Sequence, residues 1–239
     1  MHKYFAIIPA RKNSKGIKRK NLVKIGSKPM IQFTFESALK SKLIDYLILS
    51  SDDPDSIALA NKLNIATPFI RPDNLSLDDS KTSDVIMHAL QWYSNEFSNY
   101  PKNVIVLQPT SPFRNEEDID RAIEKYEKTG ADSLVSACEA SQHPSECVTI
   151  NEKNNIQLIK LNVDKNKYGR QSYDKAYFID GGIYITTSKK IIKDKVFFDE
   201  KSELYFSKKS HAIDIDDPFD LELARAMFEY SKKSKIMEI

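Results

Sequence analysis

The residues best suited to chemistry form a short basic loop near the N-terminus. Residues 11–21 read Arg-Lys-Asn-Ser-Lys-Gly-Ile-Lys-Arg-Lys-Asn and carry six positive charges and no acidic residue. Gly16 permits a sharp turn at which backbone N–H groups can approach an anion. Arginine and lysine add charge-assisted contacts to phosphate oxygens. We interpret the stretch as a phosphate-binding loop, although it lacks the G-x-x-x-x-G-K pattern of a Walker loop. A solvated basic turn or a nucleic-acid-binding patch is the alternative.

A second candidate is the acidic motif Asp214-Ile215-Asp216. In a strand, residues two apart point to the same face, so both carboxylates would lie side by side. Two adjacent carboxylates repel each other unless a cation lies between them, and Mg²⁺ beside a triphosphate would supply that cation. The motif also fits a solvated strand end in which Asp216 or Asp217 caps the next helix. The metal interpretation therefore depends on the phosphate-binding loop.

Other polar residues give weaker signals. Asp52, Arg71 and Gln108 follow predicted strands, where each could bind a ligand, cap a helix or decorate a loop. None of the four histidines has metal-binding spacing or a neighbouring nucleophile, so we assign them no catalytic role. Cys138 and Cys147 match no common zinc pattern, and we predict two buried free thiols rather than the alternative of a disulfide.

These residues must be positioned by strands that alternate with helices. Such alternation predicts βαβ units and an α/β fold with a mostly parallel sheet flanked by helices. Ligand-binding loops then lie at the carboxyl ends of the strands. Residues about 141–180 are polar and irregular, and we interpret them as an excursion from the sheet. The predicted strands are residues 4–9, 46–50, 65–70, 104–107, 133–137, 182–186 and 211–215, and the last predicted helix spans 218 to about 229.

Length and composition limit the function classes. The 239 residues suit one domain, and 41% hydrophobic residues are enough for a sizeable core. The net charge of +2 gives no overall attraction to nucleic acid or to a membrane. No apolar stretch is long enough for a signal peptide core or a membrane span, so we expect a cytoplasmic protein.

A series of motifs runs in order along nearly the whole chain. It comprises Ile8–Asn21, Ile48–Asp52, Arg71-Pro72, Leu107–Pro112 with Arg114, Ser136–Cys138 with His143-Pro144, Arg170-Gln171, Gly182–Ile185 and Asp214–Asp216. Together these motifs resemble the acylneuraminate cytidylyltransferases, the CMP-sialic acid synthetases. The long loop and the Gln-Pro-Thr-Ser-Pro run are specific, whereas the acidic motif is not.

The resemblance implies a fold and a reaction. The fold is a Rossmann-like nucleotide-sugar transferase domain over residues 1–239, in which the 141–180 excursion exchanges between the subunits of a homodimer. The reaction transfers CMP from CTP to the anomeric hydroxyl of a nonulosonic acid, an acidic nine-carbon sugar, and releases pyrophosphate with Mg²⁺ as cofactor.

The resemblance also assigns roles to individual residues. Asp180 departs from the family, because many members have Asn in this position of an Asn-Gly-Ala-Ile-Tyr run. The sugar end of the site is therefore less well defined than the nucleotide end. The implied catalytic residues are Arg11, Lys15 and Lys20; the other nucleotide-binding residues are Ser14, Asn21, Arg71 and Thr82; the sugar-binding residues are Gln108, Arg170 (reaching across the dimer), Asp180, Tyr184, Phe197 and Phe198; and the Mg²⁺ ligands are Asp214 and Asp216.

Three other interpretations stay open at the level of sequence. The substrate could be another acidic sugar, such as legionaminic acid or Kdo. The basic loop could instead dock nucleic acid, in which case binding would weaken steeply with salt. A folded pseudo-enzyme is disfavoured because both the phosphate-binding and the metal-binding residues are present.

Overall fold

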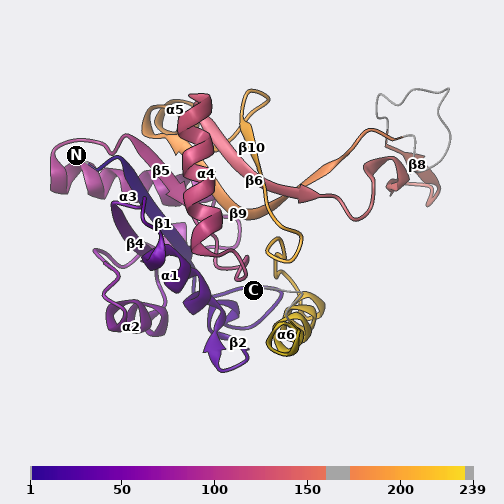
Figure 1. Cartoon of the computed structure of the whole chain (residues 1–239), viewed down its shortest axis with the longest axis horizontal. Helices are drawn as coiled ribbons and strands as arrows, with labels where there is room; N and C mark the ends of the chain where they lie inside the picture. Colours follow the sequence, from indigo (N-terminus) through magenta and orange to yellow (C-terminus); the bar gives the residue numbers. More distant parts are fainter. Residues whose placement is uncertain (1, 160–172, 235–239) are drawn as a thin grey trace.

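A six-stranded sheet organises the chain (Figure 1). The structure is a computed structural model and describes residues 2–159 and 173–234. The strand order is β10-β6-β9-β5-β1-β4, and every adjacent pair is parallel except the two pairs that involve β9. The predicted mostly parallel α/β fold is therefore confirmed. The strands are β1 (Tyr4–Ala10), β4 (Tyr46–Ser51), β5 (Asn103–Val106), β6 (Ser133–Glu139), β9 (Tyr177–Thr187) and β10 (Glu203–Phe206).

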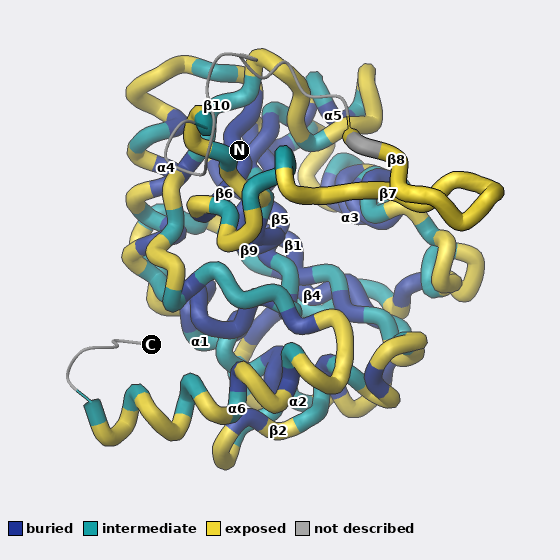
Figure 2. The backbone as a smooth tube through the Cα atoms, turned by 90° about the vertical axis from the view of Figure 1, so that its right-hand side faces the viewer, coloured by how far each residue is buried: buried dark blue, intermediate teal, exposed yellow. Residues whose placement is uncertain are grey.

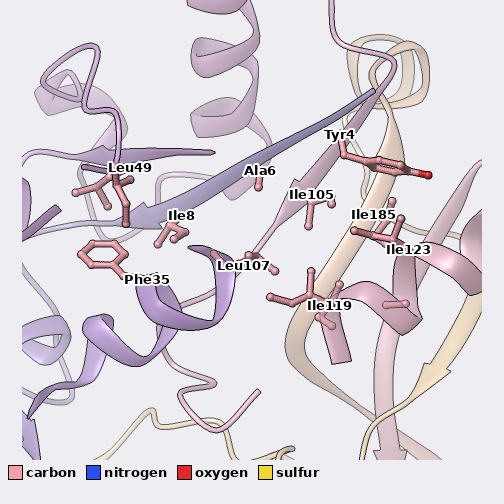
Figure 3. Packing of buried hydrophobic residues seen from close by; sticks show 14 of the residues in the cluster. Tyr4, Ala6, Ile8, Phe35, Leu49, Ile105, Leu107, Ile119, Ile123 and Ile185 are labelled. Carbon is pink, nitrogen blue, oxygen red and sulfur yellow. The ribbon is translucent and has the colours of Figure 1, made fainter. Parts of the chain in front are cut away.

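Helices cover both faces of this sheet. Along β1, Tyr4, Ala6 and Ile8 belong to a buried cluster with residues of α1, α2 and α4 (Figure 3). The alternate residues Phe5 and Ile7 pack in a second cluster with α3 and α5. A strand buried on both faces reads as a continuous apolar run, as β1 does. The helices are α1 (Met30–Lys40), α2 (Pro54–Lys62), α3 (Thr82–Phe97), α4 (Glu116–Thr129), α5 (Ser188–Asp194) and α6 (Pro218–Lys233), with short 3₁₀ turns η1 (Lys20–Leu22), η2 (Asp73–Leu75) and η3 (Pro144–Glu146).

Two predicted strands are wrong. Residues 65–70 make only isolated bridges to β4, through Ala66 and Ile70. Pro68 lies between these bridges, and its missing N–H interrupts a ladder. Residues 211–215 form no strand either. The edge position beside β6 is taken by β10.

The predicted excursion contains a projecting hairpin. Strands β7 (Val148–Ile150) and β8 (Ile156–Leu158) pair with each other and extend away from the main sheet (Figure 1). The hairpin is exposed along its visible length (Figure 2). Strand β9 begins at Tyr177, so the end of the predicted 141–180 segment lies in the main sheet. Strands β2 (Lys24–Ile25) and β3 (Lys28–Pro29) pair with each other in a separate antiparallel ladder. Over residues 2–159 and 173–234, no helix is both long and apolar enough to cross a membrane.

Candidate active site

A third hydrophobic cluster joins the basic loop to the acidic motif. Ile17 of the basic loop, Phe113 after β5, Ile215 of the acidic motif and Leu221 of α6 are buried in it together. A Cβ atom on Gly16 would lie 2.3 Å from the backbone oxygen of Asp216, so the loop approaches the motif too closely for any side chain at this position. Two segments about 200 residues apart in sequence are thereby held against each other.

The resulting pocket has a volume of about 340 Å³ and lies at the carboxyl ends of β1 and β5. It brings together seven of the predicted site residues: Arg11, Lys20, Arg71, Thr82, Gln108, Asp214 and Asp216. It also contains residues to which the sequence assigned no role, namely Pro9, Leu75, Leu77, Asp78, Ser80, Val85 and Thr110.

The cations of the basic loop are divided among several carboxylates. Lys20 Nζ lies 2.9 Å from Asp216 Oδ1 at one side of the pocket. Arg11 Nη1 lies 2.8 Å from Asp78 Oδ1 at another side. Arg19 instead pairs with acidic residues at the start of α2. Part of the positive charge that drew attention in the sequence therefore attaches the loop to the fold.

Arg71 presents unused hydrogen-bond donors to the pocket. Its side chain is buried, and its Nη2 atom lies 3.7 Å from Asp52 Oδ1. Its Nε and Nη2 atoms have no hydrogen-bond partner. Burial lowers the pKa of Arg71, although the neighbouring Asp52 opposes this effect. Because buried donors are rarely left unsatisfied, they indicate a ligand that supplies acceptors here.

The two carboxylates of the acidic motif differ in environment. Asp214 is half-buried, and its Oδ1 atom is buried without a hydrogen-bond partner. Burial, followed by the charge of Asp216, raises the pKa of Asp214. The Asp216 side chain is 75% exposed and bonds Lys20. The strand predicted to carry both carboxylates is wrong, because an extended loop carries them, and both still line the pocket.

That loop is anchored by its own backbone and by the helix that follows. Ile215 N–H donates to the carbonyl of Thr110 at 2.9 Å. Asp217, rather than Asp216, is the N-cap of α6 and forms a capping box with Asp220. The side chain of Asp216 is therefore not used as the helix cap.

The acidic motif fits a hard divalent cation in part. Asp214 and Asp216 both line the pocket and supply oxygen donors, which such cations prefer. Within the described residues, no group of three or more His, Cys, Asp or Glu side chains is gathered for metal binding. A metal bound at these two carboxylates would therefore need further oxygen ligands from a substrate or from water.

Three of the predicted sugar-binding residues form an aromatic group, in which Tyr184 lies near the charges of Asp180 and Asp214. The ring of Tyr184 lies 5.6 Å from that of Phe197 and 6.3 Å from that of Phe198. Burial raises the pKa of Tyr184 to about 12, and the nearby charges of Asp214 and Asp180 add to this effect. Arg170 lies outside the described residues.

Asp180 is held by Ser136 of β6 and by its own turn. It is 1% exposed, and its Oδ1 atom accepts hydrogen bonds from the Ser136 hydroxyl and from Gly182 N–H. Its Oδ2 atom is buried without a hydrogen-bond partner. Gly181 follows Asp180 with φ of +70°, and a Cβ atom on it would be 3.1 Å from Oε1 of Gln108, which lines the pocket. One Asp180 oxygen is thus structural, and only the other is left for a ligand or a cation.

Arg114 is a residue whose role the sequence did not reveal. It is buried, and its Nη1 atom donates to the carbonyls of Gly182 at 2.7 Å and Gln108 at 3.3 Å. Burial lowers the pKa of Arg114 to about 10, whereas Asp118 and Asp180 favour its charged form. Arg114 therefore ties the end of β5 to the bend in β9 that carries Asp180.

Three predicted nucleotide-binding residues do not line the pocket. Asn21 is buried, and its Nδ2 atom donates to the carbonyl of Arg11 at 2.9 Å, so it fixes the backbone of the loop. Ser14 lies half-buried within the loop. The Lys15 side chain is 80% exposed and reaches toward Asp78. Cys147 is exposed, contrary to prediction, whereas Cys138 is buried.

Comparison with known proteins settles the family. A family model described as "Cytidylyltransferase" matches residues 5–237. The chain belongs to the cytidylyltransferase family. It is a nucleotidyltransferase, and the resemblance to the acylneuraminate cytidylyltransferases is confirmed.

Three relatives are similar to this chain at nearly equal levels of sequence identity. They are the CMP-N,N'-diacetyllegionaminic acid synthase of Legionella pneumophila (33% identity, 97% of this chain and 98% of the relative), a pseudaminic acid cytidylyltransferase of Campylobacter jejuni (32%, 97% and 99%) and the N-acylneuraminate cytidylyltransferase of Escherichia coli (32%, 98% and 54%). A solved structure of CMP:2-keto-3-deoxy-manno-octonic acid synthetase complexed with CTP matches 96% of this chain and 99% of its own, with a TM-score of 0.68 and 18% identity, which shows a shared fold.

Proposed function

We propose that this cytidylyltransferase transfers CMP from CTP to the anomeric hydroxyl of a nonulosonic acid and releases pyrophosphate. The observation that carries the proposal is the pocket that joins Arg11 and Lys20 to Asp214 and Asp216. The names of three relatives support the substrate class, since each is named for a different acid of the sialic type. Their nearly equal identities favour no single acid among them.

The proposed reaction is an in-line attack of the sugar hydroxyl on the α-phosphorus of CTP. Negative charge grows on the phosphate oxygens and on the departing pyrophosphate, so fixed cations lower the barrier. Arg11 and Lys20 are the cations of the basic loop that line the pocket. Arg71 offers its unpartnered N–H groups to the nucleotide. Asp214 and Asp216 would hold Mg²⁺, which would supply additional positive charge beside the phosphates.

The competing class, a nucleic-acid-docking protein, is disfavoured by the family to which the chain belongs, since a cytidylyltransferase model matches residues 5–237. Binding to nucleic acid that weakens steeply with salt would support the competing class instead.

Pyrophosphate release is the direct test. The purified protein should release pyrophosphate from CTP, and not from ATP, GTP or UTP, only when Mg²⁺ and a nonulosonic acid are both present. A panel of sialic, legionaminic and pseudaminic acids and Kdo, an eight-carbon acid, would identify the substrate. Release that did not depend on an acidic sugar would contradict the proposal.

The metal assignment has its own test. Asp214→Asn and Asp216→Asn should abolish turnover while urea unfolding shows a folded protein. Isothermal titration should show weaker Mg²⁺ binding in the presence of CTP. The exposed Asp79→Asn provides a control with the same change of charge. Full activity of the wild type in EDTA would contradict the assignment.

The homodimer is part of the same proposal. On the β7–β8 hairpin, Ile150 pairs with Ile156, and both side chains are exposed, as is that of Val148. A second copy of the chain would cover these apolar side chains. Light scattering should give a dimer for the wild type and a monomer for Ile150→Asp/Ile156→Asp. A monomeric wild type would contradict the dimer.

A further inference from the structure

The acidic side chain of Asp78, which lines the pocket, forms ion pairs with two cations of the basic loop. Asp78 lies 2.8 Å from Arg11 Nη1 through one oxygen and 3.5 Å from Lys15 Nζ through the other. Arg11 Nη1 also donates to the carbonyl of Leu77 at 2.7 Å. We propose that Asp78 is an internal substitute for a phosphate group, which holds Arg11 and Lys15 until the triphosphate of CTP replaces it. This inference rests on the proposed function, because it takes Arg11 and Lys15 as phosphate ligands.

The position of Asp78 makes it a competitor of the nucleotide. Asp78 and Arg11 line the same pocket as Lys20 and Asp216. A phosphate group bound to Arg11 and Lys15 would lie close to the Asp78 carboxylate, and two like charges at short distance repel each other. The nucleotide must therefore either displace Asp78 or bind against its charge. In both cases Asp78 weakens binding.

Arg11 and Lys15 can readily exchange their ion pairs with Asp78 for contacts with another anion. The side chains of Arg11, Asp78 and Lys15 are 30%, 38% and 80% exposed. Exposed ion pairs contribute little net free energy, because water solvates the separated partners almost as well. A triphosphate carries several negative charges and can satisfy both cations at once. The exchange is therefore favourable for a polyanion, whereas a single small anion would gain little.

Asp216 is not an equivalent competitor. It also neutralises a loop cation, Lys20, but it stands beside Asp214 as a proposed metal ligand. A cation between these carboxylates and the phosphates would turn its charge into an attractive one. Asp78 pairs with Arg11 and Lys15 away from this acidic pair, so its charge would stay repulsive.

The turn that carries Asp78 can separate from the basic loop as a unit. Leu77 N–H donates to Ser80 Oγ at 3.0 Å, and Ser80 Oγ donates to the carbonyl of Asn74 at 3.2 Å. These bonds lie within the turn itself. The contacts of Arg11 with Leu77 and Asp78 connect the turn to the basic loop. Replacing those contacts by phosphate contacts leaves the turn intact.

Calorimetric titration of the full chain tests the inference without turnover. Asp78→Asn should bind CTP and inorganic tripolyphosphate about 3- to 10-fold more tightly than the wild type, which corresponds to the loss of one exposed, competing ion pair. Cytidine, which has no phosphate, should bind unchanged. Asp79→Asn makes the same change of charge at the adjacent exposed residue and should alter each dissociation constant less than 2-fold. The gain in Asp78→Asn should shrink as salt is raised.

The outcomes separate the inference from the function on which it rests. Weaker binding by Asp78→Asn than by Asp79→Asn would mean that Asp78 orients the cations, which overturns the inference and leaves the proposed function standing. Equally tighter binding by both variants would show that the change in overall charge causes the effect, and this result would also overturn the inference. A wild type that bound neither CTP nor tripolyphosphate would overturn both proposals. Urea unfolding of each variant verifies that it is folded.

Discussion

Two groups of charged side chains in this protein differ in their access to water. In the pocket, Arg11 meets Asp78 and Lys20 meets Asp216 through side chains that are partly or largely exposed. Behind the pocket, Arg114 is buried near Asp118, which accepts a hydrogen bond from the Tyr205 hydroxyl at 2.9 Å and lies 2.6 Å from His211 Nδ1. The exposed pairs can exchange their partners for a ligand, whereas separation of the buried ones would leave charges without water.

The buried group connects the backbone segments that present the site. Arg114 holds the carbonyls of Gln108 and Gly182, and His211 precedes Asp214 by three residues. Asp118 lies in the capping box at the start of α4 and contacts His211. We therefore expect changes in the buried group to alter stability, and changes in the exposed group to alter ligand binding and turnover.

The largest effect should come from Arg114→Met. Removing the buried cation takes away the donor to the carbonyls of Gln108 and Gly182 and a charge that attracts Asp118 and Asp180, which should lower the free energy of unfolding by about 3–5 kcal/mol. Arg121→Met in α4 removes an exposed i,i+4 pair with Glu117 and should change the free energy of unfolding by less than about 0.5 kcal/mol. Urea unfolding measures both. Equal losses in the two variants would remove the distinction between the groups.

The next effect concerns turnover. Arg11→Ala should reduce kcat/KM for CTP by about 2–4 kcal/mol, the usual scale for a charged contact with the transition state. Lys15→Ala should cost less than Arg11→Ala, since Lys15 is largely exposed and does not line the pocket. Neither variant should change the free energy of unfolding by more than about 1 kcal/mol. Near-normal turnover in both would contradict the phosphate-binding role of the loop.

A smaller effect should appear in the pH dependence of stability. Burial raises the pKa of Asp118, but hydrogen bonds from His211, Asn115 and Tyr205 outweigh it and leave the pKa below its ordinary value. A carboxyl with a lowered folded pKa stabilises the protein above the unfolded value of about 3.9, and this contribution disappears as pH falls through the folded value.

Asp118→Asn should therefore lose about 1–3 kcal/mol at pH 7 and show a flatter decline below pH 4 than the wild type. Urea unfolding between pH 2.5 and 7 measures the slope. Glu124→Gln, an exposed change in α4, is the control and should keep the wild-type slope. An unchanged acid slope in Asp118→Asn would contradict the assignment.

The smallest effect should come from Asp180, which lies where the two groups meet. Asn can keep the Oδ1 contacts with Ser136 and Gly182, but it places an amide where the unpartnered Oδ2 lies. We expect Asp180→Asn to shift the ranking of kcat/KM among nonulosonic acids by about 5-fold, or roughly 1 kcal/mol, with KM for CTP unchanged. An identical sugar ranking, or a change confined to CTP, would exclude Asp180 from sugar selection.

The sequence by itself determined the order of most elements and the chemistry of the loop. The apolar run of β1 required burial on both faces, because it leaves no polar side for water. Basic residues after β1 and a glutamine after β5 follow strands of one direction, so their convergence was predictable. These signals are local, since each depends on a few neighbouring residues and on the period of the backbone.

Only the tertiary structure decided which charges meet. Asp78 lies in a polar turn that resembles any surface loop in sequence, yet folding brings it to Arg11, 67 residues away. The acidic motif lacks strand pairing, because the apolar cluster around Ile215 and the bond to Thr110 hold it in an extended loop. Arg114 shows no local pattern for its role, since its neighbours come from the segment after β5, from β9 and from α4. Burial and ion pairing depend on contacts between distant segments, and no periodicity along the chain encodes them.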